Sequence, residues 1–231
     1  MSNQDYQGVF VFAQQVDGQV ASVAYELLGK ARELACARNT QVTAILLGHQ
    51  LSGLTDGLIA AGADRVLVLD KPELETYMTE PYAWAMARII KEYKPEIVLT
   101  PATAIGRDLA PRVSARVHTG LTADCTGLEI QEETGNLMMT RPAFGGNIMA
   151  TILCPDHRPQ MATVRPGVMQ RMPADAGRTG EVFQLDWNVP AETRNVEILE
   201  VVKAVAETVD IQDAKILVSG GRGMGSAENF Q

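Results

Sequence analysis

The first half of the chain alternates between two hydrophobic patterns. One pattern consists of short, almost continuous apolar runs, which are typical of buried strands: Val9 to Ala13, Val42 to Leu47, Arg65 to Leu69 and Ile97 to Thr100. The other has apolar positions at helical spacing and predicts helices: Ser22 to Arg38, Leu51 to Ala61, Pro81 to Tyr93 and Thr103 to Val117. Strands that alternate with helices in this way predict an α/β fold with a parallel sheet covered by helices on both faces.

The pattern changes in the middle of the chain, where strands follow one another without helices between them. Leu128 to Gln131 and Leu137 to Arg141 flank a turn at Glu133 to Asn136, which predicts a β-hairpin. A second hairpin is predicted from Asn147 to Leu153 and Met161 to Val164. We therefore expect an antiparallel extension of the parallel sheet.

The last part of the chain predicts an exposed loop and the end of a domain. Proline and glycine are frequent in residues 166–180, which favours a loop, and two late strands are predicted at Val182 to Asp186 and Val196 to Val202. We expect a first domain at residues 1–209. Residues 210–231 are then a linker and the start of a second domain.

Composition and charge exclude several classes of protein. The chain has 231 residues and 28 acidic against 20 basic side chains, a formal charge of -8, so it lacks the basic surface of a nucleic-acid-binding protein. No apolar run is long enough to cross a membrane, and no signal peptide is recognisable. The three cysteines are far apart and no metal motif or phosphate-loop motif occurs. We expect a cytoplasmic protein that holds no metal.

Charge is unevenly distributed. Residues 141–178 contain five arginines against two aspartates, whereas residues 181–213 contain eight acidic side chains against two basic ones. Two interpretations remain open. The runs are either solvated faces, which is the usual case, or surfaces that dock on a subunit or an anionic cofactor.

Glycines follow a short apolar run near the end of the printed chain. Lys215 to Ser219 predicts a strand, and it leads directly into Gly220, Gly221, Arg222 and Gly223. Glycines let backbone N–H groups approach a pyrophosphate, and an arginine adds a charged contact. The segment does not fit the GxGxxG pattern, so a simple tight turn is the alternative. Too few residues follow to complete a sheet, and we expect this chain to be a piece of a longer protein.

Two further segments place polar groups beside predicted loop positions. Gly106 to Asp108 follows the fourth predicted strand and should lie at the carboxyl end of the sheet, where ligands of such sheets gather. Arg141 begins the segment Arg141-Pro-Ala-Phe-Gly-Gly-Asn147, in which adjacent glycines allow a backbone or a flat ring to approach. The alternatives are helix capping for the first segment and a β-bulge for the second.

Five segments taken together resemble one known family. They are Gly106-Arg-Asp-Leu-Ala-Pro-Arg112, Thr119-Gly-Leu-Thr-Ala-Asp-Cys125, Arg141-Pro-Ala-Phe-Gly-Gly-Asn147, Thr163-Val-Arg-Pro-Gly167 and Ser219-Gly-Gly-Arg-Gly223. In this order they are similar to the alpha subunit of electron-transfer flavoproteins. The resemblance extends over nearly the whole chain and is least specific in residues 1–95 and 170–195.

The resemblance implies a heterodimer of alpha and beta subunits that carries electrons by way of FAD between flavin dehydrogenases, such as those acting on acyl-CoA, and a redox partner. It implies a nucleotide-hydrolase-like, Rossmann-type first domain that docks on the beta subunit and holds no flavin. The second domain binds FAD, with Gly221, Arg222 and Gly223 among the contacts by motif. Because the flavin carries the redox chemistry, no catalytic side chain is expected in this chain.

Some members of the family carry a second FAD in the beta subunit, where others hold AMP, and bifurcate electrons from NADH. The resemblance implies that Arg141, Phe144, Gly145 and Asn147 face this nucleotide of the beta subunit. We expect Arg141 to lie near the isoalloxazine ring and to favour its anionic form, because a cation stabilises a developing negative charge.

Two other functions are compatible with the residue patterns alone. An α/β domain of this kind could be a non-redox sensor that binds an adenine nucleotide at the edge of its sheet, although residues 1–210 contain no recognisable phosphate motif. A purely structural subunit is the other alternative. Only the flavoprotein function predicts a yellow complex that releases FAD on denaturation.

Overall fold

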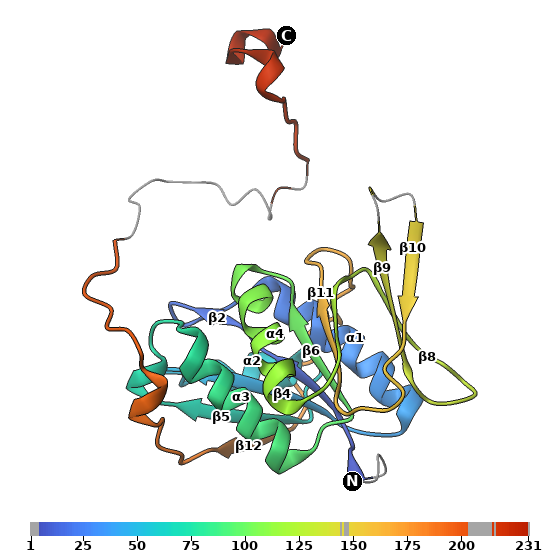
Figure 1. Ribbon diagram of the computed structural model, residues 1–231, viewed down its shortest axis with the longest axis vertical. Coiled ribbons are helices and arrows are strands. Elements are labelled where there is room, and N and C mark those ends of the chain that lie inside the picture. Colours follow the sequence, from blue (N-terminus) through green and yellow to red (C-terminus); the bar gives the residue numbers. More distant parts are fainter. Residues whose placement is uncertain (1–4, 144, 146–147, 203–213, 215, 231) are drawn as a thin grey trace. The chain divides into compact units, whose positions relative to one another are not determined.

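The structure, a computed structural model, describes residues 5–143, 145, 148–202, 214 and 216–230 (Figure 1). The chain divides into two compact units, Met1–Asn195 and Val196–Gln231. The domain end that the sequence predicts near Val209 lies outside the described residues.

The first unit is built on a seven-stranded sheet in which every pair of neighbouring strands is parallel. The strand order is β12-β5-β4-β1-β6-β11-β7. The strands are β1 (Val9–Phe12), β4 (Val42–Gly48), β5 (Arg65–Asp70), β6 (Ile97–Pro101), β7 (Leu121–Cys125), β11 (Gln160–Val164) and β12 (Glu181–Gln184). The parallel α/β fold expected from the sequence is confirmed, and each of the four predicted early strands is present.

Helices cover both faces of this sheet, as Figure 1 shows. They are α1 (Ser22–Arg38), α2 (Thr55–Ala60), α3 (Thr79–Tyr93) and α4 (Ala104–Val117). Alternate residues of a strand face opposite sides, so Val9 and Val11 pack with α1 and α2 in one apolar cluster. Phe10 and Phe12 pack with α3 and α4 in the other cluster. Each buried strand therefore contributes side chains to two cores.

Three of the four predicted helices have nearly the predicted bounds, and α2 is shorter than predicted. Leu51 to Leu54 forms a turn before α2, because Gly53 adopts a left-handed φ of 85° that a helix does not allow. The Asp70 carboxylate accepts hydrogen bonds from the N–H groups of Gln50 (2.9 Å) and Leu51 (2.8 Å) and holds this turn against β5.

A separate antiparallel sheet of three strands packs on α1. It has the order β10-β9-β8, with β8 (Gly127–Ile130), β9 (Leu137–Ala143) and β10 (Ile148–Ile152). Leu128, Leu137 and Met139 point into the same apolar cluster as α1. The first predicted hairpin is confirmed, since β8 and β9 pair with Ile130 opposite Leu137.

The second predicted hairpin is wrong. β10 pairs with β9, with Ile148 opposite Ala143, whereas β11 lies in the large sheet between β6 and β7 and is parallel to both. All five residues of β11 are buried, as expected for a central strand of a parallel sheet. Both segments have the apolar pattern of a strand, but the pattern does not say which distant strand each one pairs with.

The late predicted strands have different outcomes. The one at Val182 to Asp186 is confirmed as β12, which pairs with β5 at the edge of the sheet. Residues 196–202 and the described part of the segment from Lys215 to Ser219, residues 216–219, form no strand, and those predictions are wrong for this structure. A strand needs a neighbour for its backbone groups, and the described part of the second unit contains none.

The remaining elements are short. β2 (Gln15–Val16) and β3 (Gln19–Val20) form a two-stranded ribbon, and single 3-10 turns occur at η2 (Pro72–Leu74), η4 (Ala191–Thr193), η5 (Arg222–Met224) and η6 (Ala227–Phe230). Residues 166–180 form no helix or strand and are largely exposed, so the predicted loop is confirmed.

Candidate functional site

The strand order places a topological switch at the centre of the large sheet. From β1 the chain moves to β4 and β5 on one side, and it then crosses to β6 on the other side. Ligands and partners of open α/β sheets gather outside the carboxyl ends of the strands at such a switch. Gly106 to Asp108 lies in the first turn of α4 just after β6, so the predicted placement at this edge is confirmed.

The start of α4 is held tightly against the end of β6. The Gly106 N–H donates to Thr103 Oγ1 (3.1 Å), which caps the helix, and the Thr103 hydroxyl donates to Gln14 Oε1 (2.6 Å). A Cβ added at Gly106 would stand 1.7 Å from the carbonyl oxygen of Pro101. Glycine is required here because the helix begins in contact with the preceding backbone.

Asp124 is the centre of a cluster of charges at this edge. Its carboxylate accepts from Arg165 Nη2 at 2.6 Å and from Arg107 Nη2 at 3.1 Å. Its backbone N–H donates to Thr163 Oγ1 at 2.8 Å, which fixes the end of β7 beside β11. The hydrogen bond from Arg165 is the main cause that lowers the pKa of Asp124, and the charges of Arg165, Arg107 and Arg141 act in the same direction against the effect of burial.

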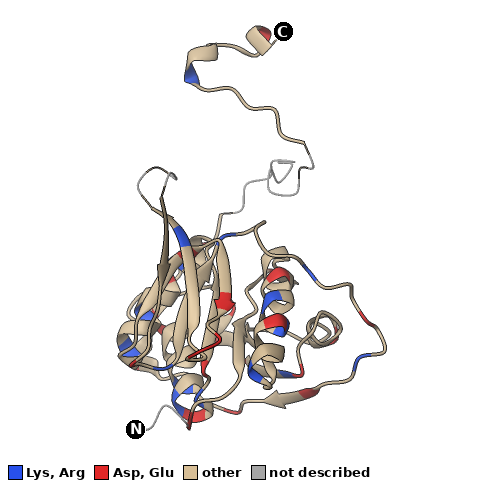
Figure 2. Cartoon of the chain, turned by 90° about the vertical axis from the view of Figure 1, so that its right-hand side faces the viewer, with Lys and Arg blue, Asp and Glu red and all other residues tan. Residues whose placement is uncertain are grey.

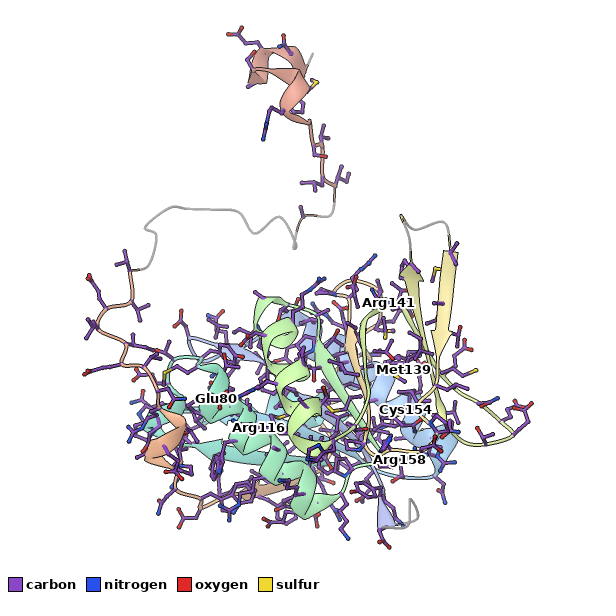
Figure 3. All side chains as sticks on the ribbon, in the orientation of Figure 1. Glu80, Arg116, Met139, Arg141, Cys154 and Arg158 are labelled. Atoms are coloured by element: carbon purple, nitrogen blue, oxygen red, sulfur yellow. The ribbon has the colours of Figure 1, made fainter. Side chains whose placement is uncertain are left out.

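Arg141 joins this cluster from β9. It lies two residues from the buried Met139, so both side chains are on the face of β9 that is turned toward the large sheet (Figure 3). Burial raises the pKa of the Cys125 thiol to about 11, and the charge of Arg141 acts to lower it. In the described part of the chain no carboxylate forms an ion pair with Arg141. Its charge acts on Asp124 through space, without a direct contact.

Three charged residues of α4 have structural partners away from Asp124. Arg112 and Arg116 both bind the carboxylate of Glu80 on α3, Arg112 at 2.7 Å, and so tie α4 to α3 (Figure 3). Asp108 accepts from the hydroxyls of Tyr77 and Thr79, each at 2.6 Å. These contacts fix the helices and leave Arg107 as the residue of this segment that turns toward Asp124.

Four of the five segments that carry the family resemblance therefore meet at one edge. They contribute Arg107, Asp124, Arg141 and Arg165. Arg141 was expected to be a site residue from the sequence, whereas the contacts of Asp124 with Arg107 and Arg165 were not expected. A partial signal was present, because Arg107 follows the predicted strand that ends at Thr100 and Arg165 directly follows the apolar run from Met161 to Val164. No strand was predicted at Leu121 to Cys125, so the pattern did not place Asp124 beside them.

The loop that carries Arg165 has a buried anchor. Glu26 on α1 has only 8% of its surface exposed, and its carboxylate accepts from the N–H of Gly167 at 2.8 Å. Arg165 is held from the other side, since its N–H donates to the carbonyl of Cys125 at 3.0 Å. Glu26 thus positions a functional loop, and nothing in the sequence pattern indicates this role.

The turn after β9 contains the other predicted residues of this region. Gly145 is exposed, has a left-handed φ of 73° and leaves open space where a side chain would stand. Phe144 and Asn147 lie outside the described residues. The backbone at Gly145 is therefore accessible to a ligand or another chain, and Arg141 lies at the charge cluster of Asp124.

The glycine-rich segment in the second unit is an exposed turn. Gly221 precedes η5, and its carbonyl accepts from the N–H of Met224 at 3.0 Å. No atom lies within 4 Å of a Cβ built on Gly221 or Gly223. Arg222 is exposed, and within the described residues it forms no ion pair.

The same residues offer no metal site, disulfide or membrane-spanning helix. No three His, Cys, Asp or Glu side chains among them are arranged to hold a metal ion. Their cysteines are all free thiols: Cys36, Cys125 and Cys154. In the described part of the chain no helix combines the length and the apolarity that a membrane span requires.

Comparison with known proteins identifies the family. Residues 9–189 match the electron transfer flavoprotein domain. The chain is 51% identical over 226 residues to the electron transfer flavoprotein subunit alpha of Thermoanaerobacterium thermosaccharolyticum, an alignment that covers 98% of this chain and 68% of that protein. It is 47% identical to the corresponding subunit of Clostridium acetobutylicum, over 100% of this chain and 69% of that one.

A third relative has a more specific name. The lactate dehydrogenase (NAD(+),ferredoxin) subunit LctC of Acetobacterium woodii is 42% identical over 219 residues, which are 95% of this chain and 52% of that protein. The segments that meet around Asp124 all lie within the matched domain. The chain thus belongs to the electron transfer flavoprotein family, as an alpha subunit whose function is electron transfer.

Proposed function

We propose that this chain docks on a beta subunit and carries electrons, by way of FAD, between flavin dehydrogenases and a redox partner. One observation carries the proposal. Four separate segments converge on the charge cluster of Asp124, and Arg141 is left without a carboxylate partner among the described residues. Arg141 is partly buried beside this cluster, and a negative group of a partner would add a favourable contact for it.

The described residues of the glycine-rich turn fit an FAD phosphate. Gly221 and Gly223 leave their backbone open to close approach, and Arg222 offers an exposed guanidinium that can bind phosphate oxygens in a bidentate manner. We propose that these three residues hold the FAD of the second domain. When bound, the flavin supplies the hydride and electron chemistry. The role of these residues is to bind and orient it.

At the other site, Arg141 and Gly145 face the nucleotide of the beta subunit, with Phe144 and Asn147 from the same turn. Two geometric features support this. Gly145 presents a backbone without a side chain in open space, and Arg141 lies on the face of β9 that is turned toward the cluster. That nucleotide is AMP or a second FAD. The second possibility gains support from the relative whose name joins NAD(+) with ferredoxin, because such an enzyme uses two electron acceptors or donors.

The division of the chain supports a docking domain and a separate flavin domain. The compact unit that ends at Asn195 contains the sheet edge, and the unit that begins at Val196 contains the glycine-rich turn. We propose that residues 1–209 dock on the beta subunit and that residues 210–231 connect to and begin the FAD domain.

The experiment that tests the proposal is co-purification of the full protein with its beta subunit, followed by a visible absorption spectrum and release of the cofactor by denaturation. We expect a heterodimer with flavin bands and FAD in the supernatant. A colourless heterodimer would contradict the electron-transfer role of this protein. It would favour a non-redox nucleotide sensor or a structural subunit.

A further inference from the structure

A long loop runs over α1 and is fixed to it at several points. Residues 165–180, which we call the strap, lead from β11 to β12 and form no helix or strand. Most of their side chains are exposed, but Met169 is buried and packs in the same apolar cluster as α1. Exposed loops are usually the most mobile part of a fold, so a loop that is held down along its length calls for an explanation.

The first anchor of the strap lies two residues beyond Arg165. The carboxylate of Glu26 on α1 accepts from the N–H of Gly167 at 2.8 Å, and Glu26 is only 8% exposed. Gly167 has a left-handed φ of 79°, which a residue with a side chain rarely adopts, so the strap turns at this point. The side chain of Arg165, by contrast, is 44% exposed and binds Asp124 at 2.6 Å. A buried residue thus fixes the backbone from which an exposed side chain of the charge cluster extends.

Two further anchors hold the rest of the strap. A Cβ added at Gly29 would lie 2.3 Å from a carbonyl oxygen of the strap, so the two segments are in direct contact there. The carboxylate of Asp64 accepts from Arg178 on the strap and from Arg32 on α1, each at 2.6 Å. Glu26, Gly29 and Arg32 follow one another at intervals of three residues, which places them along one side of α1. The strap therefore follows this side of the helix between the sheet edge and β12.

Packing alone does not explain a carboxylate at position 26. Figure 2 shows that α1 carries residues of both charges, and the other acidic residue of this helix, Glu33, pairs with Lys30 and has a side chain that is 62% exposed. Glu26 is buried, and in the described part of the chain no basic side chain forms an ion pair with it. Burying a carboxylate is costly unless hydrogen bonds satisfy it, and an apolar residue would fill the same space without that cost. The hydrogen bond to Gly167 is the feature of Glu26 that an apolar residue could not supply.

We propose that Glu26 is a positioning residue: through the strap it holds Arg165 on Asp124, and so it fixes the charges that the sheet edge presents to the nucleotide of the beta subunit. The inference rests on the proposed function, which assigns this edge to the nucleotide, and it deepens that function by naming a residue that acts on the edge from α1. Arg165 is held on one side by its N–H bond to the carbonyl of Cys125 at 3.0 Å and on the other by the anchor at Gly167. Both are needed, because a long side chain keeps one geometry only when the backbone on either side of it is fixed.

Amide hydrogen exchange of the full protein tests whether the anchor acts at a distance. Glu26→Ala removes the acceptor of the Gly167 N–H, so exchange at Gly167 rises in any case. The informative amide is that of Asp124, which donates to Thr163 Oγ1 at 2.8 Å and not to Glu26. We expect its exchange to rise by about threefold or more, because Asp124 loses the arginine that holds its side chain. Unaltered exchange at Asp124 would overturn the inference and leave the proposed function intact.

Four further variants separate the hydrogen bond from charge and from general loosening of the strap. Glu26→Gln keeps the reach and an acceptor oxygen, so exchange at Asp124 should remain native, whereas Glu26→Asp keeps the charge but is one methylene shorter and should behave like Glu26→Ala. Arg178→Ala frees the far end of the strap, and Glu33→Ala changes an exposed carboxylate of the same helix; both should leave Asp124 unaltered. If Glu26→Gln or Arg178→Ala raised this exchange as much as Glu26→Ala, the inference would be overturned. If Glu26→Ala fails to fold, Glu26→Asp and Glu26→Gln still make the comparison.

The reduction potential of the beta-subunit flavin, measured in the complex, provides the functional test. Glu26→Ala and Arg165→Ala should shift this potential in the same direction, and the variant with both changes should shift it no further than Arg165→Ala alone, because Glu26 acts only through Arg165. If the beta subunit binds AMP instead of a second FAD, its dissociation constant for AMP is measured in the same three variants. Shifts that add would overturn the inference, because Glu26 would then act by another route. If Arg165→Ala changes neither quantity, the proposed role of the sheet edge fails, and this inference fails with it.

Discussion

The two sheets of the first unit differ in what covers them. In the seven-stranded sheet the central strands are buried along their whole length, as in β4 and β11, and helices lie on both faces. In the three-stranded sheet, β8 and β9 contribute apolar side chains to the core, whereas β10 is exposed along most of its length. Among the described residues, one sheet is covered by helices on both faces and the other leaves its outer strand exposed.

We expect the large sheet to determine the stability of the protein and the small sheet to determine what it binds. The charge cluster of Asp124 lies between the two sheets, since Asp124 and Arg165 belong to or follow strands of the large sheet and Arg141 belongs to β9. Substitutions in the large sheet should therefore unfold the protein. Substitutions in the outer hairpin should leave it folded and change what it binds.

The largest expected difference in unfolding free energy is between two substitutions that each shorten an aliphatic side chain. Leu99 on β6 is fully buried, and Leu99→Ala should lower the free energy of unfolding by about 2–5 kcal/mol through lost burial and a cavity. Ile152 on β10 is 39% exposed, and Ile152→Ala should change the free energy of unfolding by about 0.5 kcal/mol or less. Urea denaturation of both variants measures the difference. Similar losses would show that β10 belongs to the core.

The next effect concerns the junction between β6 and α4. Gly106→Ala places a Cβ against the carbonyl oxygen of Pro101, and the backbone must shift, which should cost about 1–3 kcal/mol or more. Gly223→Ala in the second unit meets nothing within 4 Å and serves as the control. Thermal unfolding of the first unit should therefore change in one variant only. An unaltered melting temperature for Gly106→Ala would mean that the edge of the large sheet is not rigid.

A smaller, pH-dependent effect is expected from Asp124. Its pKa is lowered in the folded state, so its contribution to stability is present above the unfolded value of about 3.9 and is lost as pH falls through the lower folded pKa. Asp124→Asn should remove this part of the pH dependence and cost about 1 kcal/mol or less near pH 7, because both arginines are partly exposed. Unfolding free energies across the acid range measure it. Parallel pH profiles for the native protein and the variant would contradict it.

The smallest effect on stability, and the most specific effect on function, is expected from Arg141. Arg141→Ala removes no ion pair within the described residues, only the longer-range attraction to Asp124, and should lower the melting temperature very little. If a flavin of the beta subunit lies near this cation, its reduction potential should fall, by about 30 mV for each 1.4 kcal/mol of lost stabilisation in a two-electron couple. Arg141→Lys keeps the charge and is the control. If the flavin reduction potential is the same in all three proteins, Arg141 does not belong to the flavin site.

Much of the fold could be predicted because it depends on local patterns. The bounds of α1 and β4 agree closely with the apolar spacing, and the parallel sheet follows from the alternation of strands and helices. The prediction was wrong where pairing is non-local. β11 joins strands that are far away in the sequence, and the apolar run at Gln160 to Val164 is equally compatible with a hairpin.

The sequence indicated individual segments of the candidate site but not which of their residues lie together. The motif segments identified the family, and the expectation that Arg141 stabilises a negative flavin stays a prediction. The pairing of Asp124 with Arg107 and Arg165 was not foreseen, because it depends on how three strand ends meet in space. Glu26 was missed for the same reason, since a helix residue becomes an anchor only when the loop at Gly167 packs over it.

The sequence by itself determined the class of fold, the position of most helices and the family, because hydrophobic periodicity and motif order are properties of neighbouring residues. Tertiary structure alone decided that β11 enters the large sheet, that Asp124 gathers arginines, and that β10 is left as an uncovered apolar edge. Each of these depends on contacts between segments that are distant along the chain. A local pattern can state that a residue will be buried or paired, but only the folded chain supplies the partner.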